Sequence, residues 1–163
     1  MDRKICCFTG HRHIPHDIIL HLPEKLDSLI DELIASGYRE FRCGGAQGFD
    51  TIAALKVLEK KKTFGEEIKL CLYLPCKDQT RGWSESAKRA YSLVLERADS
   101  VCYAAEAYNS GCMHARNRAL IDRSKYCIAF LEKSSGGTAY TVDYARRSGV
   151  IVLNLAEIAA TKI

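Results

Sequence analysis

Short, nearly unbroken apolar runs alternate along this chain with longer segments of helical periodicity. The apolar runs predict strands at residues 4–9, 40–43, 68–74, 101–104, 126–131 and 150–155. The clearest helix is expected near residues 22–34, where leucine and isoleucine recur at positions 22, 26, 29, 30, 33 and 34 on one helical face. Further helices are expected at residues 51–61, 84–98, 112–124 and 138–148, with a short tail helix after the last strand.

The regular alternation of strands and helices indicates the fold class. Strands without polar alternation are typical of a sheet covered by helices on both faces. Strict β-α alternation predicts a mostly parallel, doubly wound sheet with right-handed crossovers. We therefore predict a single α/β domain over residues 1–163 with a three-layer Rossmann-like fold.

Two glycine-rich turns connect a predicted strand to a predicted helix. The first glycine turn is residues 42–50 (RCGGAQGFD), and the second is residues 134–138 (SSGGT). Glycine permits positive φ and close approach of a ligand to the backbone. The following helix N-terminus attracts anions, phosphate in particular. Because two such turns occur in one small domain, we predict a phosphate-bearing ligand.

Other polar residues follow the same ends of the predicted strands, where open α/β sheets bind ligands. Residues 10–12 follow the first strand, and residues 79–83 follow the third. The complete set of candidate ligand-binding residues is Gly10, His11, Arg12, Gly44, Gly45, Ala46, Gln47, Gly48, Asp50, Gln79, Trp83, Arg116, Asn117, Gly136, Gly137 and Thr138.

Several of these residues have two open interpretations. Asn117 lies on the apolar stripe of its helix, so it either contacts the ligand or bonds a neighbouring loop. Asp50 either accepts sugar hydroxyls or stabilises the first turn of its helix. Arg12 would offer a bidentate fork to a phosphate. Trp83 either stacks on a base or simply packs.

Composition narrows the function classes. The chain is 47% hydrophobic and 27% charged, as in an ordinary soluble domain, and its net charge is +4. No apolar run is long enough for a membrane span and no signal peptide is evident, so we expect a cytoplasmic protein without a membrane partner. The eight cysteines form no Cys-x-x-Cys pair, and no metal site is predicted. The absence of a Walker loop and of G-x-G-x-x-G disfavours ordinary NTPase or dehydrogenase chemistry.

Four ordered motifs together resemble a known family. Residues 9–12 (TGHR), 45–50 (GAQGFD), 116–117 (RN) and 136–138 (GGT) are similar to the YpsA-like branch of the SLOG superfamily. That superfamily includes the DNA-processing protein DprA and the LOG phosphoribohydrolases. The resemblance implies a Rossmann-like fold and a nucleotide-type ligand in a pocket formed by the glycine motifs.

The relatives imply rival functions. A DprA-like protein would bind single-stranded DNA, and residues 45–50 and 116–118 resemble the DprA motifs. A net charge of +4 without a basic stripe gives this function limited support. A LOG-like enzyme would cleave an N-glycosidic bond, but its catalytic glutamate corresponds here to Thr141. The expectation is therefore a sensor or regulatory module that binds ADP-ribose, NAD or a nucleoside phosphate, with an enzyme of unassigned catalytic residue as the alternative. Pairing through a helix face is common in the family, which leaves a homo-oligomer open.

Overall fold

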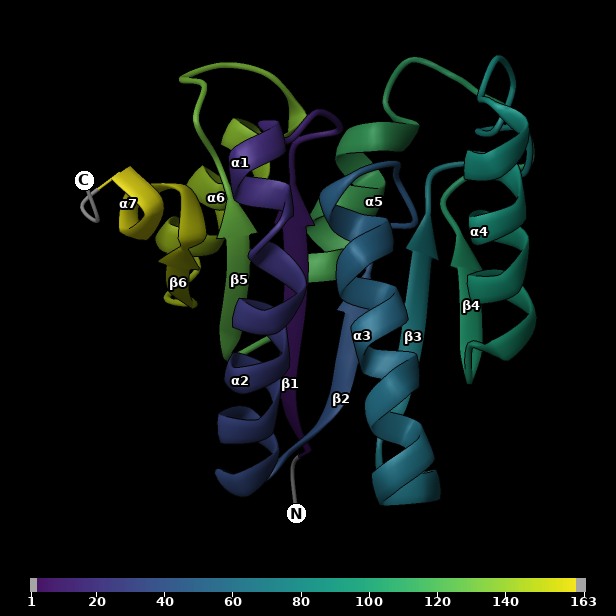
Figure 1. Ribbon diagram of the computed structural model, residues 1–163. Helices are drawn as coiled ribbons and strands as arrows, with labels where there is room; N and C mark the ends of the chain where they lie inside the picture. Colours follow the sequence, from purple (N-terminus) through teal and green to yellow (C-terminus); the bar gives the residue numbers. More distant parts are fainter. Residues whose placement is uncertain (1–2, 161–163) are drawn as a thin grey trace.

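The computed structural model of the protein describes residues 3–160 and contains one six-stranded parallel sheet (Figure 1). The strand order is β4-β3-β2-β1-β5-β6, and every neighbouring pair is parallel. The strands are β1 (Lys4–Gly10), β2 (Tyr38–Cys43), β3 (Lys69–Leu74), β4 (Ser100–Tyr103), β5 (Tyr126–Phe130) and β6 (Ile151–Asn154). The predicted α/β fold with a parallel sheet is therefore confirmed.

Helices cover both faces of the sheet. They are α1 (His16–Ile19), α2 (Leu22–Ala35), α3 (Phe49–Phe64), α4 (Glu85–Arg97), α5 (Cys112–Ile121), α6 (Gly137–Arg147) and α7 (Leu155–Ala160), with a 3-10 turn, η1 (Gly65–Glu67). The sequence pattern missed the short α1 and η1, because neither has enough turns to show a period. Within residues 3–160, no helix is both long and apolar enough to cross a membrane.

The two faces have separate cores, and β1 contributes to both. Cys6 and Phe8 pack into a large cluster with residues of α2, α3 and α4. Cys7, which points to the opposite face, packs with Leu120 of α5 and Val142 of α6. This period of two is the normal geometry of a strand, and burial on both faces explains why residues 5–8 are all apolar.

The chain reverses direction across the sheet at β1. Strands β1 to β4 add successively on one side, whereas β5 pairs with β1 on its other side. The connection that crosses the sheet contains α5 (Figure 1). In doubly wound folds the crevice at such a reversal, beyond the carboxyl ends of the strands, is the ligand site.

The first glycine turn is packed tightly against the loop that follows β1. Phe49 donates its backbone N–H to the His11 carbonyl oxygen at 3.2 Å. A Cβ at Gly48 would overlap the backbone carbonyl of Arg12, and a Cβ at Gly45 would overlap the Leu74 side chain. The glycines of this turn are thus required for close packing of protein against protein.

Replacing Gly48 by alanine tests that packing, with Gly65 as the matched control. The two glycines have similar backbone angles, φ 76° and ψ −120° at Gly48 and φ 66° and ψ −145° at Gly65. A Cβ at Gly65 has nothing within 4 Å. Gly65→Ala should lower the free energy of unfolding by about 1–3 kcal/mol through backbone strain alone. Gly48→Ala should cost about 2 kcal/mol more because of the overlap with Arg12.

Urea denaturation of both variants at one temperature measures the difference. Equal losses in the two variants would contradict the packing role of Gly48.

Candidate functional site

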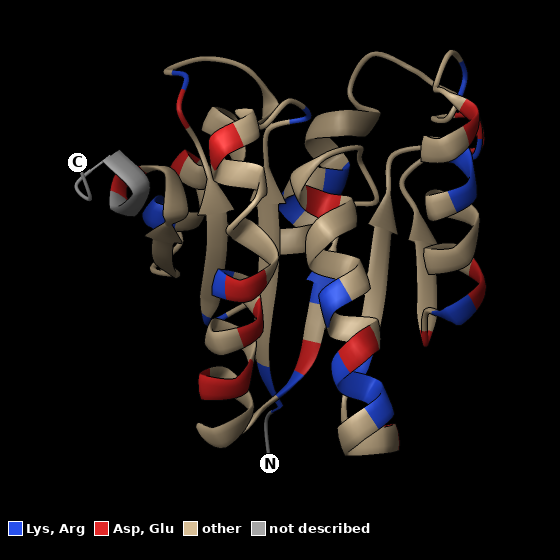
Figure 2. Cartoon of the chain, viewed as in Figure 1, with Lys and Arg blue, Asp and Glu red and all other residues tan. Residues whose placement is uncertain are grey.

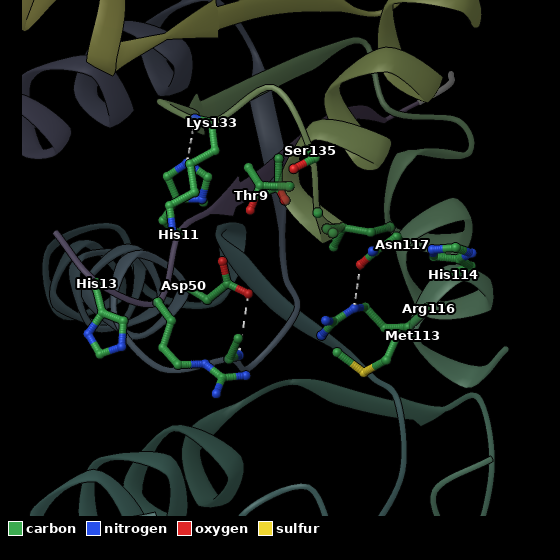
Figure 3. A pocket seen from close by; sticks show the side chains of 17 residues that line it. Thr9, His11, His13, Asp50, Met113, His114, Arg116, Asn117, Lys133 and Ser135 are labelled. Carbon is green, nitrogen blue, oxygen red and sulfur yellow. Dashed lines mark hydrogen bonds between the residues drawn. The ribbon is translucent and has the colours of Figure 1, made fainter. Parts of the chain in front are cut away.

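A cavity of about 560 Å³ lies at the carboxyl ends of the central strands (Figure 3). Four segments that are distant in sequence form its wall: the end of β1 and its loop, the start of α3, one side of α5, and the β5–α6 loop. Its lining residues are Thr9, Gly10, His11, Arg12, His13, Ala46, Asp50, Met113, His114, Arg116, Asn117, Leu120, Lys133, Ser135, Gly136, Gly137 and Thr138.

Asp50 is the only carboxylate in this wall, and it is 5% exposed. Its Oδ2 accepts a hydrogen bond from the Ala46 N–H at 3.3 Å, whereas Oδ1 is buried and has no partner among the described residues. Burial raises the pKa of Asp50 to about 6, although Arg116 and the backbone amides of Ala46 and Gly10 act in the opposite direction. A buried oxygen without a hydrogen bond costs free energy, so a ligand that donates a hydrogen bond to this atom would be favoured.

The Arg116 guanidinium joins α5 to the first glycine turn. The side chain is 6% exposed and donates to the Gly44 carbonyl oxygen and, at 2.7 Å, to Asn117 Oδ1. Burial lowers the pKa of Arg116, and the charge of Asp50 opposes that effect. An arginine remains charged under these conditions, so the cavity wall carries a fixed buried cation.

Asn117 presents its amide nitrogen to the second glycine turn. Its Oδ1 is occupied by Arg116, but its Nδ2 makes no hydrogen bond within residues 3–160. A Cβ at Gly137 would lie 3.8 Å from this nitrogen. Both sequence interpretations of Asn117 thus have a structural counterpart: its oxygen bonds a protein neighbour, and its nitrogen faces the cavity.

The second glycine turn opens into the cavity. Gly136 has a φ of 102° and precedes the first residue of α6, and no side chain caps this helix. A Cβ at Gly136 would have nothing within 4 Å, in contrast to the crowded Gly45 and Gly48. The N-terminus of α6 therefore lines the cavity without a side-chain cap, and an uncapped helix N-terminus is a site that binds anions.

His11 fastens the loop that leads to this turn. Its Nε2 accepts hydrogen bonds from the backbone N–H groups of Glu132 at 2.8 Å and of Lys133 at 3.2 Å, and Figure 3 shows the second of them. Burial, followed by the charge of Lys133, lowers the pKa of His11. A protonated Nε2 could not accept these bonds, so His11 is held in the neutral form with its proton on Nδ1.

The structure brings together ten of the sixteen predicted residues and separates six from the cavity. The ten that line it are Gly10, His11, Arg12, Ala46, Asp50, Arg116, Asn117, Gly136, Gly137 and Thr138. Those outside the wall are Gly44, Gly45, Gln47, Gly48, Gln79 and Trp83. Of the first glycine turn, Ala46 and Asp50 line the cavity, and the backbone N–H of Ala46 already donates to Asp50 Oδ2.

Trp83 and Gln79 lie behind the first glycine turn. The Trp83 ring packs edge-on against Tyr91, with centroids 5.5 Å apart. Gln79 Nε2 would be 3.3 Å from a Cβ at Gly45. The loop after β3 thus supports the turn on the side away from the cavity. Trp83 packs against protein there, as in the second of its two interpretations.

Seven further residues line the cavity: Thr9, His13, Met113, His114, Leu120, Lys133 and Ser135. Thr9 and Ser135 lie in the predicted motifs, although neither is among the candidate ligand-binding residues. Met113 and His114 could have been found from periodicity, since they precede Asn117 by four and three residues on one helix. The wall carries Arg12, Arg116 and Lys133 against Asp50, a balance that favours an anionic ligand. Among residues 3–160, no three His, Cys, Asp or Glu side chains gather as a metal site, and all eight cysteines are free thiols.

Two solved structures share the fold. DNA processing protein A (DprA) from Streptococcus pneumoniae has a TM-score of 0.66 at 17% identity, covering 92% of this chain and 49% of that one. DprA from Helicobacter pylori, described with its single-stranded DNA binding mode, has a TM-score of 0.65 at 19% identity, covering 91% and 63%. The chain thus spans about half to two thirds of these proteins, and such low identities establish the architecture alone.

Sequence comparison is more specific. The uncharacterized SPbeta prophage-derived protein YoqJ of Bacillus subtilis is 31% identical, with 80% of this chain and 83% of that protein aligned. The model of the YspA SLOG family matches residues 5–149, a span that contains all four wall segments of the cavity. The chain belongs to the YspA SLOG family.

Proposed function

We propose that this protein binds a small nucleotide-type ligand, such as ADP-ribose, NAD or a nucleoside phosphate, as a sensor or regulatory module. The observation that carries the proposal is the uncapped N-terminus of α6, which opens into the cavity beside the free amide nitrogen of Asn117. A cavity of about 560 Å³ is within the usual range for small-molecule sites.

The phosphate group would lie at the second glycine turn. There the backbone N–H groups of Gly137 and Thr138 and the Asn117 amide would donate hydrogen bonds to it. The charges of Arg12 and Lys133 in the same wall would add electrostatic attraction. This arrangement needs no metal ion to neutralise the phosphate.

The sugar would lie against Asp50. A ribose hydroxyl is a donor, and the buried Oδ1 of Asp50 is an acceptor without a partner among the described residues. A hydrogen bond between them would remove the cost of that unpaired oxygen and would favour the ionised carboxylate. Binding of a ribosyl ligand should therefore release protons near pH 6.

A second candidate is an enzyme that cleaves an N-glycosidic bond, and the pKa of Asp50 favours it. A carboxyl group that titrates at about 6 is suited to acid-base work near neutral pH. It would have to act without the LOG-type acid, because Thr141 is fully buried and donates to the Gly137 carbonyl oxygen at 2.8 Å. Turnover of the bound nucleotide, lost in Asp50→Asn with binding retained, would establish the enzyme.

Single-stranded DNA binding has weaker support. Figure 2 shows positive and negative residues interspersed on α2 and α3, where Lys60 bonds both Asp27 at 2.8 Å and Asp31 at 2.7 Å. Such ion pairs neutralise positive charge that would otherwise attract the phosphates of DNA. Saturable oligonucleotide binding that weakens steeply with salt, without a response to nucleotides, would favour this function instead.

Gly137 offers a matched test of the phosphate position. A side chain fits there, since an added Cβ would meet only Asn117 Nδ2 at 3.8 Å. Gly137→Asp would place a carboxylate where the phosphate should bind, whereas Gly137→Asn adds a neutral side chain of the same size. The aspartate variant should bind AMP and ADP-ribose at least about tenfold more weakly than the asparagine variant, by like-charge repulsion.

Isothermal titration of the native protein and both variants gives the affinities. The aspartate variant should be no less stable than the asparagine variant, because an anion in the first turn suits the helix dipole. Equal affinities of the two variants would place the phosphate elsewhere, and no binding by the native protein would refute the proposed function.

The pH dependence of stability tests the environment of Asp50. The folded-state pKa of about 6 exceeds the ordinary 3.8, so the contribution of Asp50 to stability is full below pH 3.8 and is lost as pH rises through 6. The free energy of unfolding of the native protein minus that of Asp50→Asn should therefore decrease by about 3 kcal/mol between pH 3.5 and 7.5. Urea denaturation of both proteins across this range measures it, and a difference that rises with pH would contradict the raised pKa.

A further inference from the structure

An aromatic stack stands at the α5 side of the cavity. The rings of His114 on α5 and Tyr140 on α6 lie 4.0 Å apart between centroids and within 10° of parallel. The Tyr140 hydroxyl accepts a hydrogen bond from Arg118 at 2.9 Å, which fixes the tyrosine ring. The stack therefore presents His114 in a defined orientation rather than as a freely rotating surface side chain.

His114 lines the cavity, whereas Tyr140, which stacks on one face of the His114 ring, does not. The neighbouring Met113 also lines the cavity and is 36% exposed. This part of the wall is thus a thioether beside an exposed aromatic ring, a surface suited to the flat face of a nucleobase.

The position of the stack relative to Asp50 defines the shape of the ligand. Figure 3 shows Asp50 and His114 on opposite sides of Asn117, which faces the second glycine turn at Gly137. A phosphate bound at that turn would therefore have the sugar-binding carboxylate on one side and the aromatic wall on the other. A ligand that contacts both Asp50 and His114 would therefore extend from its phosphate in two directions.

We propose that His114, stacked on Tyr140, forms a nucleobase subsite on the α5 wall, and that the ligand extends to both sides of the phosphate. This inference rests on the proposed function and specifies its ligand class: a pyrophosphate with a nucleoside at the α5 wall and a ribose at Asp50. In this proposal His114, which lines the cavity, takes the base-stacking role that is one of the two interpretations of Trp83.

Three ligands and three variants separate the subsites. ADP-ribose and AMP carry the base, and ribose 5-phosphate lacks it. His114→Ala should weaken ADP-ribose and AMP about tenfold by loss of stacking, and it should leave ribose 5-phosphate unchanged. His114→Phe keeps an aromatic face and should retain most of the affinity for the base-containing ligands. Trp83→Phe, a change outside the cavity wall, should alter none of the three.

Isothermal titration of each ligand, with thermal unfolding as a check on folding, separates failure of the base subsite from failure of the proposed function. If the native protein binds none of the three ligands, the proposed function fails. If it binds them and His114→Ala affects all alike or none, the phosphate site stands and the base subsite is wrong. Loss of ADP-ribose affinity in Trp83→Phe, with His114→Ala unaffected, would also overturn the subsite.

Discussion

The buried guanidinium of Arg116 is the interaction on which the site depends. It crosses from α5 to the Gly44 carbonyl of the first glycine turn and also holds Asn117 through Oδ1. A charge that is 6% exposed requires compensation, and Asp50 provides the nearby negative charge. Because Arg116 uses the Asn117 oxygen, the amide nitrogen is directed to the second turn. The orientation of the Asn117 amide at the start of α6 is thus determined by contacts between α5 and the first glycine turn.

The two glycine turns have different tasks despite their similar sequences. The first is filled by protein: Gly48 meets the Arg12 backbone and Gly45 meets Leu74. The second faces open space, and His11 holds the loop before it through two backbone N–H groups. The first turn therefore builds the wall of the cavity and supplies Asp50, whereas the second supplies the free N–H groups that an anion needs.

The architecture could be predicted from the sequence because strands that are buried on both faces of the sheet appear as continuous apolar runs. It also predicted that the ends of β1 and β5 and the start of α3 would meet. It could not tell which glycine turn is open, since that depends on which atoms approach each Cβ position. The sequence also leaves two interpretations of Trp83 open, because its packing on Tyr91 depends on the path of the loop after β3, which no local pattern predicts.

The phosphate of the ligand should lie at the second glycine turn and not at the glycines of the first, and amide NMR during a titration with ADP-ribose tests this most directly. We predict the largest chemical-shift changes at the backbone amides of Gly137 and Thr138 and at the side-chain amide of Asn117. The amides of Gly45 and Gly48 should change little, because protein atoms fill the space around them. The largest changes at Gly45 and Gly48, with Gly137 unaffected, would contradict the account.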